Sequence, residues 1–215
     1  GSWLARMLLR WGSSMTTPPA TPRPIAWEHQ PAPNIASRAK GTIELVLGDL
    51  VNEDVMAIIA PVGSGEAGVS RAQLSVHRAA GPGLAKEYDE RVARLPSGVI
   101  APLEHIVTGG HALRAKYVVH CRLLEASQAQ DNAEAALATC LRRAFETCRS
   151  LGVDSIAMPA LGTGAYGYRT SAVARVSMRC AVAAQRHSAG PARIRFLLAG
   201  PATLETFLQA LSATE

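Results

Sequence analysis

With 215 residues, the chain is long enough for one ordinary domain and short for two. A hydrophobic fraction of 48% and a charged fraction of 18% fit a globular protein, and no apolar run approaches the roughly 20 residues of a membrane-spanning helix. Most of the net charge of +5 lies in residues 1–41, and the rest of the chain holds 17 basic and 16 acidic side chains, so a nucleic-acid partner is only weakly indicated.

The first residues of the chain are amphipathic. Trp3, Met7 and Trp11 recur at helical spacing, which predicts a short amphipathic helix over residues 3–11. The start is rich in arginine and free of acidic residues, so it also resembles an organellar presequence, and targeting by residues 1–27 stays open beside a packing helix or a vector-derived extension.

A proline-rich stretch follows. Residues 16–34 hold six of the 13 prolines, which excludes a regular helix or a central strand and predicts an extended linker. We therefore expect residues 1–41 to be a tail and linker, and residues 42–215 to be the folded module.

Within the module, strand-like and helix-like segments alternate. The expected strands are 42–47, 55–60, 100–107, 117–121, 155–159 and 194–198, and the expected helices are 72–80, 84–94, 132–151, 171–186 and 202–211. This alternation predicts an α/β fold with a largely parallel or mixed sheet and helices on both faces.

The four cysteines are widely spaced, and they form no CxxC pair and no zinc-ligand pattern with histidine. No metal or other cofactor is expected. Reduced thiols of this kind are typical of the cytoplasm or another reducing compartment.

One stretch is built to approach an anion. Between an expected strand and an expected helix, residues 162–167 read Gly-Thr-Gly-Ala-Tyr-Gly. Glycines let the backbone turn tightly, and successive N–H groups at a strand-to-helix turn form an anion-binding nest. The run is neither a P-loop nor a Rossmann fingerprint. A tight structural turn remains the alternative interpretation.

Two further stretches are candidates for the same ligand site. Asp49 follows the first expected strand, at the sheet edge where ligands usually bind. Its carboxylate suits an exocyclic amine of a base, and a turn or cap is the alternative. The Gly- and Ser-rich run 61–71 is either a second ligand loop facing the first or a surface loop.

Four stretches, taken in order, resemble the macrodomain family. Leu47-Gly48-Asp49-Leu50 is similar to its Gly-Asp-Ile/Leu motif, and residues 77–84 match the stretch after its first phosphate loop almost letter for letter. Residues 108–120 resemble its central segment, and residues 157–168 resemble its second phosphate loop. Together these motifs cover about residues 42–212.

This resemblance implies a three-layer α/β/α fold with a central mixed sheet that binds ADP-ribose at the C-terminal edge of its strands. It implies that Asp49 binds the adenine amine beside the Leu50 backbone, and that Tyr166 flanks the distal ribose. The remaining ligand-binding residues implied by the two loops are Gly68, Val69, Gly162, Thr163, Gly164 and Ala165. Within these motifs His77, Arg78 and His120 are expected to be structural.

The first loop departs from the family pattern. Many macrodomain hydrolases carry Asn-Ala-Ala-Asn after the second strand, where residues 60–63 here read Ala-Pro-Val-Gly, and an acidic residue after the loop, where this chain has Ser70. Glu66 is the only nearby carboxylate and is the candidate catalytic base. A general base must reach its water within about 2.6–3.2 Å, or through one further water.

Three functions therefore remain open. The first is a binding module that recognises ADP-ribose, or a related nucleotide diphosphate, alone or on a modified macromolecule. The second is an ADP-ribosyl hydrolase acting on modified protein, nucleic acid or O-acetyl-ADP-ribose. The third is a degenerate macrodomain that binds RNA or protein instead.

Overall fold

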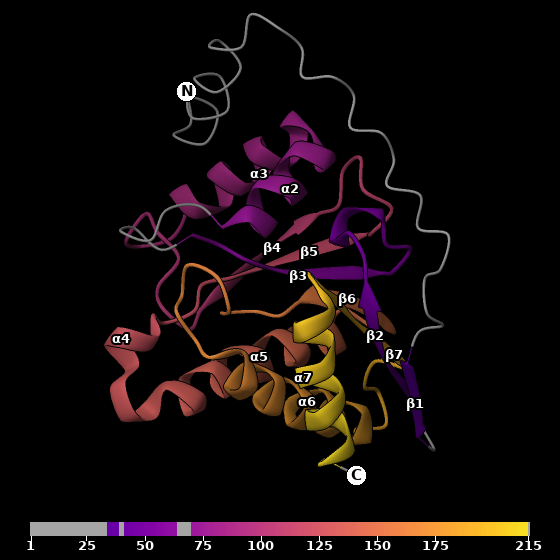
Figure 1. The fold of residues 1–215 in the computed structure, drawn as a ribbon. Helices are drawn as coiled ribbons and strands as arrows, with labels where there is room; N and C mark the ends of the chain where they lie inside the picture. Colours follow the sequence, from indigo (N-terminus) through magenta and orange to yellow (C-terminus); the bar gives the residue numbers. More distant parts are fainter. Residues whose placement is uncertain (1–33, 39–40, 64–69, 215) are drawn as a thin grey trace, which may run out of the picture.

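A seven-stranded sheet lies at the centre of the computed structural model, which describes residues 34–38, 41–63 and 70–214 (Figure 1). Its strand order is β1-β2-β7-β6-β3-β5-β4. The strands are β1 (Asn34–Arg38), β2 (Gly41–Leu47), β3 (Ala57–Pro61), β4 (His105–Gly109), β5 (Tyr117–Cys121), β6 (Ser155–Pro159) and β7 (Arg193–Leu198). The helix expected over 3–11 and the targeting segment 1–27 lie outside the described residues, as do Glu66, Gly68 and Val69.

The sheet is parallel through its middle and antiparallel at both edges. β2, β7, β6, β3 and β5 pair in parallel, whereas β1 on β2 and β4 on β5 are antiparallel. Parallel strands end at the same edge of a sheet, so the segments after β2, β7, β6 and β3 come together there. This common edge carries the site.

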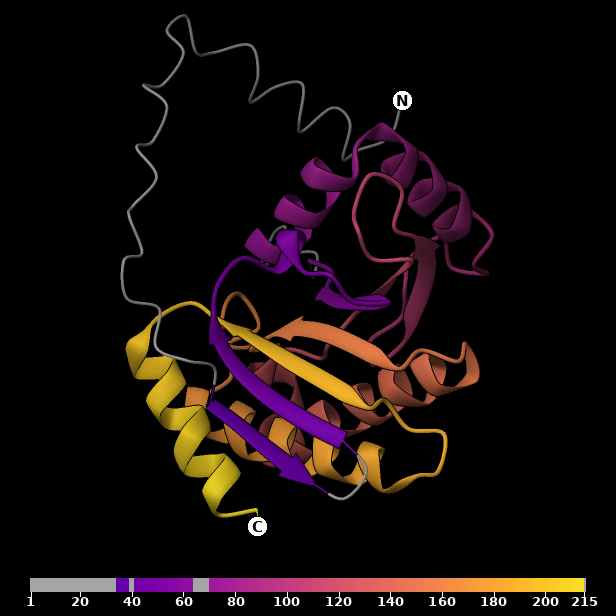
Figure 2. The same ribbon diagram turned by 90° about the vertical axis from the view of Figure 1, so that its right-hand side faces the viewer.

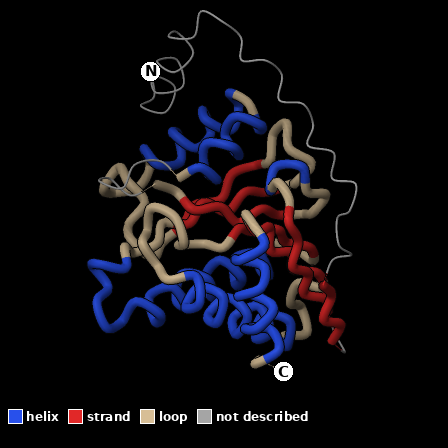
Figure 3. Tube along the Cα trace, in the orientation of Figure 1, coloured by secondary structure: helices blue, strands red, loops and turns tan. Residues whose placement is uncertain are grey.

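Helices cover both faces, which confirms the expected three-layer α/β/α fold with a mixed sheet (Figure 3). α2 (Arg71–Ala80) and α3 (Pro82–Ala93) lie on one face. On the other face are α5 (Ala133–Ser150), α6 (Thr170–Arg186) and α7 (Pro201–Ser212). Short helical segments complete the fold: η1 (Leu50–Asn52), α4 (Ala126–Ala129) and η2 (Gln130–Asn132).

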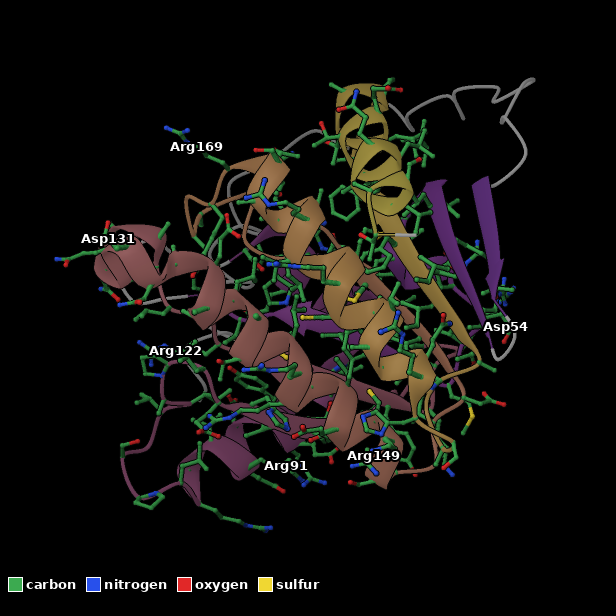
Figure 4. All side chains as sticks on the ribbon, turned by 90° about the horizontal axis from the view of Figure 1, so that it is seen from below. Asp54, Arg91, Arg122, Asp131, Arg149 and Arg169 are labelled. Atoms are coloured by element: carbon green, nitrogen blue, oxygen red, sulfur yellow. The ribbon has the colours of Figure 1, made fainter. Side chains whose placement is uncertain are left out.

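The core has two parts because side chains alternate across each strand. In β3, Ile59 packs toward α5, α6 and α7, and Ile58 packs toward α2 and α3. In β6, Met158 and Ala157 divide in the same way. Figure 4 shows the lower layer from below, with Asp131 and Arg169 near one end of the α5–α6 pair and Arg149 at the other. All four cysteines are buried and free.

Two boundaries differ from the sequence prediction. β1 lies before the expected module start at residue 42, and Figure 2 shows it beside β2 at the sheet edge. The prolines just before β1 favour the prediction of a linker. An edge strand is paired on one side only, so its sequence carries a weaker strand signal. The strand expected over 100–107 begins only at His105, because Leu103 adopts a φ of 67° in the preceding turn.

In the described part of the chain, no helix is long and apolar enough to cross a membrane. Nor do His, Cys, Asp and Glu side chains gather there in a group of three or more that suits a metal ion.

Candidate functional site

A cleft of about 620 Å³ opens at the C-terminal edge of the central strands. Its size falls in the range of small-molecule and cofactor sites. The described residues that line it are Pro61, Ser70, Arg71, Ala72, Pro159, Ala160, Gly162, Thr163, Gly164, Ala165, Tyr166, Leu197, Ala199 and Thr203. The strand order places the segment after β6 in the middle, with the segments after β3 and β7 on either side.

The loop after β6 forms the centre of the cleft with a backbone that only glycine adopts easily. Gly162 has a φ of 103°, and a Cβ there would lie 3.0 Å from the ring of Tyr168. This conformation lets the Tyr168 N–H donate to the Gly162 carbonyl, while the Thr163 N–H and side chain both donate to the Ala160 carbonyl. The turn is thus closed by its own carbonyls.

The remaining N–H groups of that loop are left for another acceptor. None of the described residues accepts a hydrogen bond from the N–H groups of Gly162, Gly164, Ala165 or Tyr166. Gly162 and Tyr166 are buried, and buried backbone N–H groups almost always find a partner, whereas Gly164 and Ala165 are exposed. A run of free N–H groups beside a cleft is the arrangement that binds phosphate oxygens.

Two helix N-termini add to this array. α7 begins at Pro201 without a side-chain cap, and Ala199 and Thr203 at its start line the cleft. α2 begins at Arg71, and both Arg71 and Ala72 line the cleft. The first turn of a helix carries unsatisfied N–H groups and a partial positive charge, so both ends favour an anion.

The wall after β3 is held by the side chains of Ser70, the N-cap residue of α2, and of Gln73 within α2. The Ser70 hydroxyl donates to the Pro61 carbonyl at 3.0 Å and accepts from the Gln73 N–H at 3.0 Å. The buried Gln73 side chain in turn accepts from the Gly63 N–H at 2.6 Å. These bonds fix residues 61–63 against the helix.

Tyr166 ties the two sides of the cleft together. Its hydroxyl donates to the Val62 carbonyl at 2.5 Å, and the Val62 N–H donates to Cys121 in β5. Burial raises the pKa of Tyr166 well above its usual value, so the hydroxyl stays protonated. Tyr166 lines the cleft, and its hydroxyl is occupied by the hydrogen bond to Val62 inside the protein.

Asp49 lies at the same sheet edge but outside the lining of the cleft. It is exposed after β2, and its Oδ1 accepts from the Val51 N–H at 3.3 Å, which caps η1. The capping role that the sequence left open is thus present. Its other carboxylate oxygen makes no bond to a described residue, and the Leu50 side chain is buried in the part of the core that packs toward α2 and α3.

His77 and His120 pack in the core rather than in the cleft. Each ring contacts Tyr88 edge to face, and His120 also bonds the Thr108 hydroxyl at 2.9 Å. Burial lowers the pKa of His77 to about 4 and that of His120 to about 3, so both are neutral at pH 7. This placement fits the structural role expected for them.

The sequence interpretation named the run 61–71 only as a candidate ligand loop. It did not identify Arg71, Ala72, Ala199 and Thr203 as individual lining residues, and it did not foresee that Ser70 and Gln73 hold the wall after β3. A signal for part of this set was present, because Ser70-x-x-Gln73 has the pattern of a capping box. Half of that box forms, and the Gln73 side chain bonds Gly63 instead of the cap residue. No local sequence pattern identifies Ala199 or Thr203. They line the cleft because the strand order places β7 beside β6.

The charge in the cleft is one-sided. Arg71 is the only charged side chain among its described lining residues, and no carboxylate is among them. The described surroundings therefore suit an anion and supply no general base.

Comparison with known proteins identifies the family. Residues 59–177 match the family model described as the macro domain. The chain belongs to the macro domain family. A macro domain-containing protein of Caldanaerobacter subterraneus subsp. tengcongensis is 28% identical over 171 residues, which are 80% of this chain and 96% of that protein. An O-acetyl-ADP-ribose deacetylase of Cronobacter sakazakii is 33% identical over 137 residues, which are 64% of this chain and 75% of that protein.

Solved structures support the same assignment. The Oceanobacillus iheyensis macrodomain with ADP has a TM-score of 0.77 and 25% identity to this macro domain, and the match covers 85% of this chain and 96% of that one. The Trypanosoma brucei macrodomain in complex with ADP has a TM-score of 0.67 at 22% identity, covering 79% and 68% of the two chains. The second likeness concerns the fold alone.

Proposed function

We propose that this macro domain binds ADP-ribose, or a related nucleotide diphosphate, as a recognition module. The observation that carries the proposal is the array of free N–H groups around the cleft. The Gly162–Tyr166 loop supplies them at the centre, and the starts of α2 and α7 supply them on either side. Such an array matches a diphosphate because each N–H donates to a phosphate oxygen without bringing a counter-charge.

The order of the strands sets the direction of the ligand. β2 and β3 are three strand positions apart, with β7 and β6 between them. At about 4.8 Å per position, their ends are roughly 14 Å apart. With the diphosphate on the loop after β6, Asp49 after β2 meets the adenine amine beside the Leu50 backbone. The distal ribose then lies toward β3, next to Tyr166.

The relatives agree with this ligand class. One solved macrodomain of similar fold is described with ADP, which shares the adenosine diphosphate portion of ADP-ribose. One relative is named for action on O-acetyl-ADP-ribose. Both ligands carry an adenosine diphosphate, and only O-acetyl-ADP-ribose has a further group beyond it.

Hydrolysis is the second candidate, favoured by the named deacetylase relative. It needs a base close to the attacking water. The described lining contains no carboxylate, so the role falls to Glu66 or to the ligand's own phosphate. Incubation with mono-ADP-ribosylated protein and with O-acetyl-ADP-ribose tests this: release of ADP-ribose that Glu66→Gln abolishes supports hydrolysis, and tight binding without release supports recognition alone.

A Gly164→Val variant tests the binding proposal at its centre. A Cβ at Gly164 meets no atom within 4 Å, and its φ is not in the left-handed region, so valine fits the fold and adds bulk at a residue that lines the cleft. We expect a melting temperature close to wild type and ADP-ribose affinity at least about tenfold lower by calorimetry. Unchanged affinity in a normally folded variant would reject the loop as the diphosphate site.

A further inference from the structure

Arg71 occupies a position that folding alone does not favour. It is the first residue of α2, whose first turn holds no acidic residue. A cation there faces the positive end of the helix dipole, an arrangement that costs stability. In contrast, Arg78 lies in the last turn of the same helix, where the helix dipole favours a positive charge.

No partner within the described chain offsets this cost. None of the ion pairs of the described residues includes Arg71, and no hydrogen bond from its guanidinium to them is present. The side chain is exposed, yet it lines the cleft and is the only charged group among the described lining residues. An anion bound in the cleft would complement both the guanidinium and the helix end.

The position of Arg71, opposite the loop after β6, indicates which part of the ligand its side chain contacts. Arg71 follows β3, and the free N–H groups of Gly164 and Ala165 follow the neighbouring β6. Side chains and backbone from these two segments line one cleft from adjacent strands. A diphosphate bound to the loop therefore has phosphate oxygens that face the N-terminus of α2, on the side of the cleft away from Asp49.

We propose that Arg71 is a specificity-determining residue that clamps the ligand diphosphate against the Gly162–Tyr166 loop. The inference rests on the proposed binding function and adds a charged contact that the family motifs in this sequence do not contain. The loop recognises phosphate through neutral N–H groups, and among the described lining residues Arg71 alone supplies a formal positive charge. Binding should therefore weaken with salt, and the protein should give up some stability for the contact.

The proposal predicts effects of opposite sign on stability and on binding, which a structural role would not produce. In Arg71→Gln, removal of the misplaced charge should raise the melting temperature of the ligand-free protein by about 1–3 °C. The same change should weaken ADP-ribose binding about tenfold at low salt, because a charge-assisted contact to phosphate is lost. It should also flatten the salt dependence of the affinity.

Arg78→Gln is the matched control. Arg78 lies on the same helix about 10 Å further along its axis, is exposed and does not line the cleft. This variant should lower the melting temperature slightly or leave it unchanged, and ADP-ribose affinity should stay within about twofold. Arg71→Lys should retain part of the affinity, because the charge remains while the fork of donors is lost.

The outcomes distinguish failure of the Arg71 contact from failure of the proposed ADP-ribose binding. If the wild type binds ADP-ribose and Arg71→Gln binds it equally well at low salt, the clamp is wrong and the binding function stands. If Arg71→Gln loses affinity together with melting temperature, the residue acts through the fold and the clamp is again wrong. If the wild type gives no heat with ADP-ribose, the proposed function fails and the clamp fails with it.

Discussion

The Tyr166 hydroxyl donates a hydrogen bond of 2.5 Å to the Val62 carbonyl. The two residues are 104 positions apart in the chain, and they join the loop after β6 to the segment after β3. The two walls of the cleft are therefore fixed to each other before any ligand arrives. A preformed cleft binds more tightly, because less ordering remains to be done on binding.

Tyr166→Phe should loosen this connection without emptying the core. The ring stays, but the Val62 carbonyl loses its side-chain donor inside the protein. We expect the free energy of unfolding to fall by about 1–2 kcal/mol, measured by urea denaturation. ADP-ribose affinity should fall by a smaller factor than in Gly164→Val. Equal stability of the variant and the wild type would show that the bond contributes nothing.

Gln73→Leu should release the other end of the same segment. Gln73 is buried, and its side chain holds the Gly63 N–H at 2.6 Å, so leucine leaves that N–H without its partner. We expect a loss of about 1–3 kcal/mol in the free energy of unfolding. Amide hydrogen exchange should also be faster at residues 62 and 63. Exchange that stays as slow as in the wild type would contradict the conclusion that Gln73 holds residues 62 and 63 in place.

Acid should destabilise the protein through its buried histidines. The pKa of His77 is about 4 in the folded state and about 6.5 when unfolded. Above pH 6.5 both states are neutral and His77 has no effect. Between pH 6.5 and 4 the unfolded state binds a proton that the folded state does not, so stability falls by about 1.4 kcal/mol per pH unit.

A histidine variant isolates this effect from that of the carboxylates. Between pH 7 and 5 the wild type should lose about 2 kcal/mol more unfolding free energy than His77→Gln. His187→Gln, which removes an exposed histidine, should follow the wild type. If His77→Gln and the wild type lose the same amount, His77 is not held neutral by burial.

Much of the fold was predictable because its signals are local. The apolar run 55–60 and the short segment 155–159 correspond to β3 and β6, and the long amphipathic helices fall within a few residues of their expected ends. Gly162 was predictable for a related reason, since its φ of 103° requires glycine. β1 was missed because prolines come just before it. As an edge strand of the described sheet, it has β2 as its one neighbouring strand.

The site was predictable only in part. The loop after β6 is continuous in sequence, so its glycines and its position before a helix revealed it. Arg71 and Thr203 come from other elements, and they could be recognised as lining residues only after the strand order had brought these elements to one edge. The bond from Tyr166 to Val62 likewise depends on tertiary structure, because no pattern in the chain relates the two residues.

Calorimetric titration of the wild-type protein with ADP-ribose tests the central claim most directly. The account predicts saturable heat with one site per chain, at an affinity that falls with rising salt. Ribose 5-phosphate, which lacks both the diphosphate and the adenine, should give far weaker binding. Absence of heat at millimolar ADP-ribose, from protein that melts cooperatively, would contradict the account.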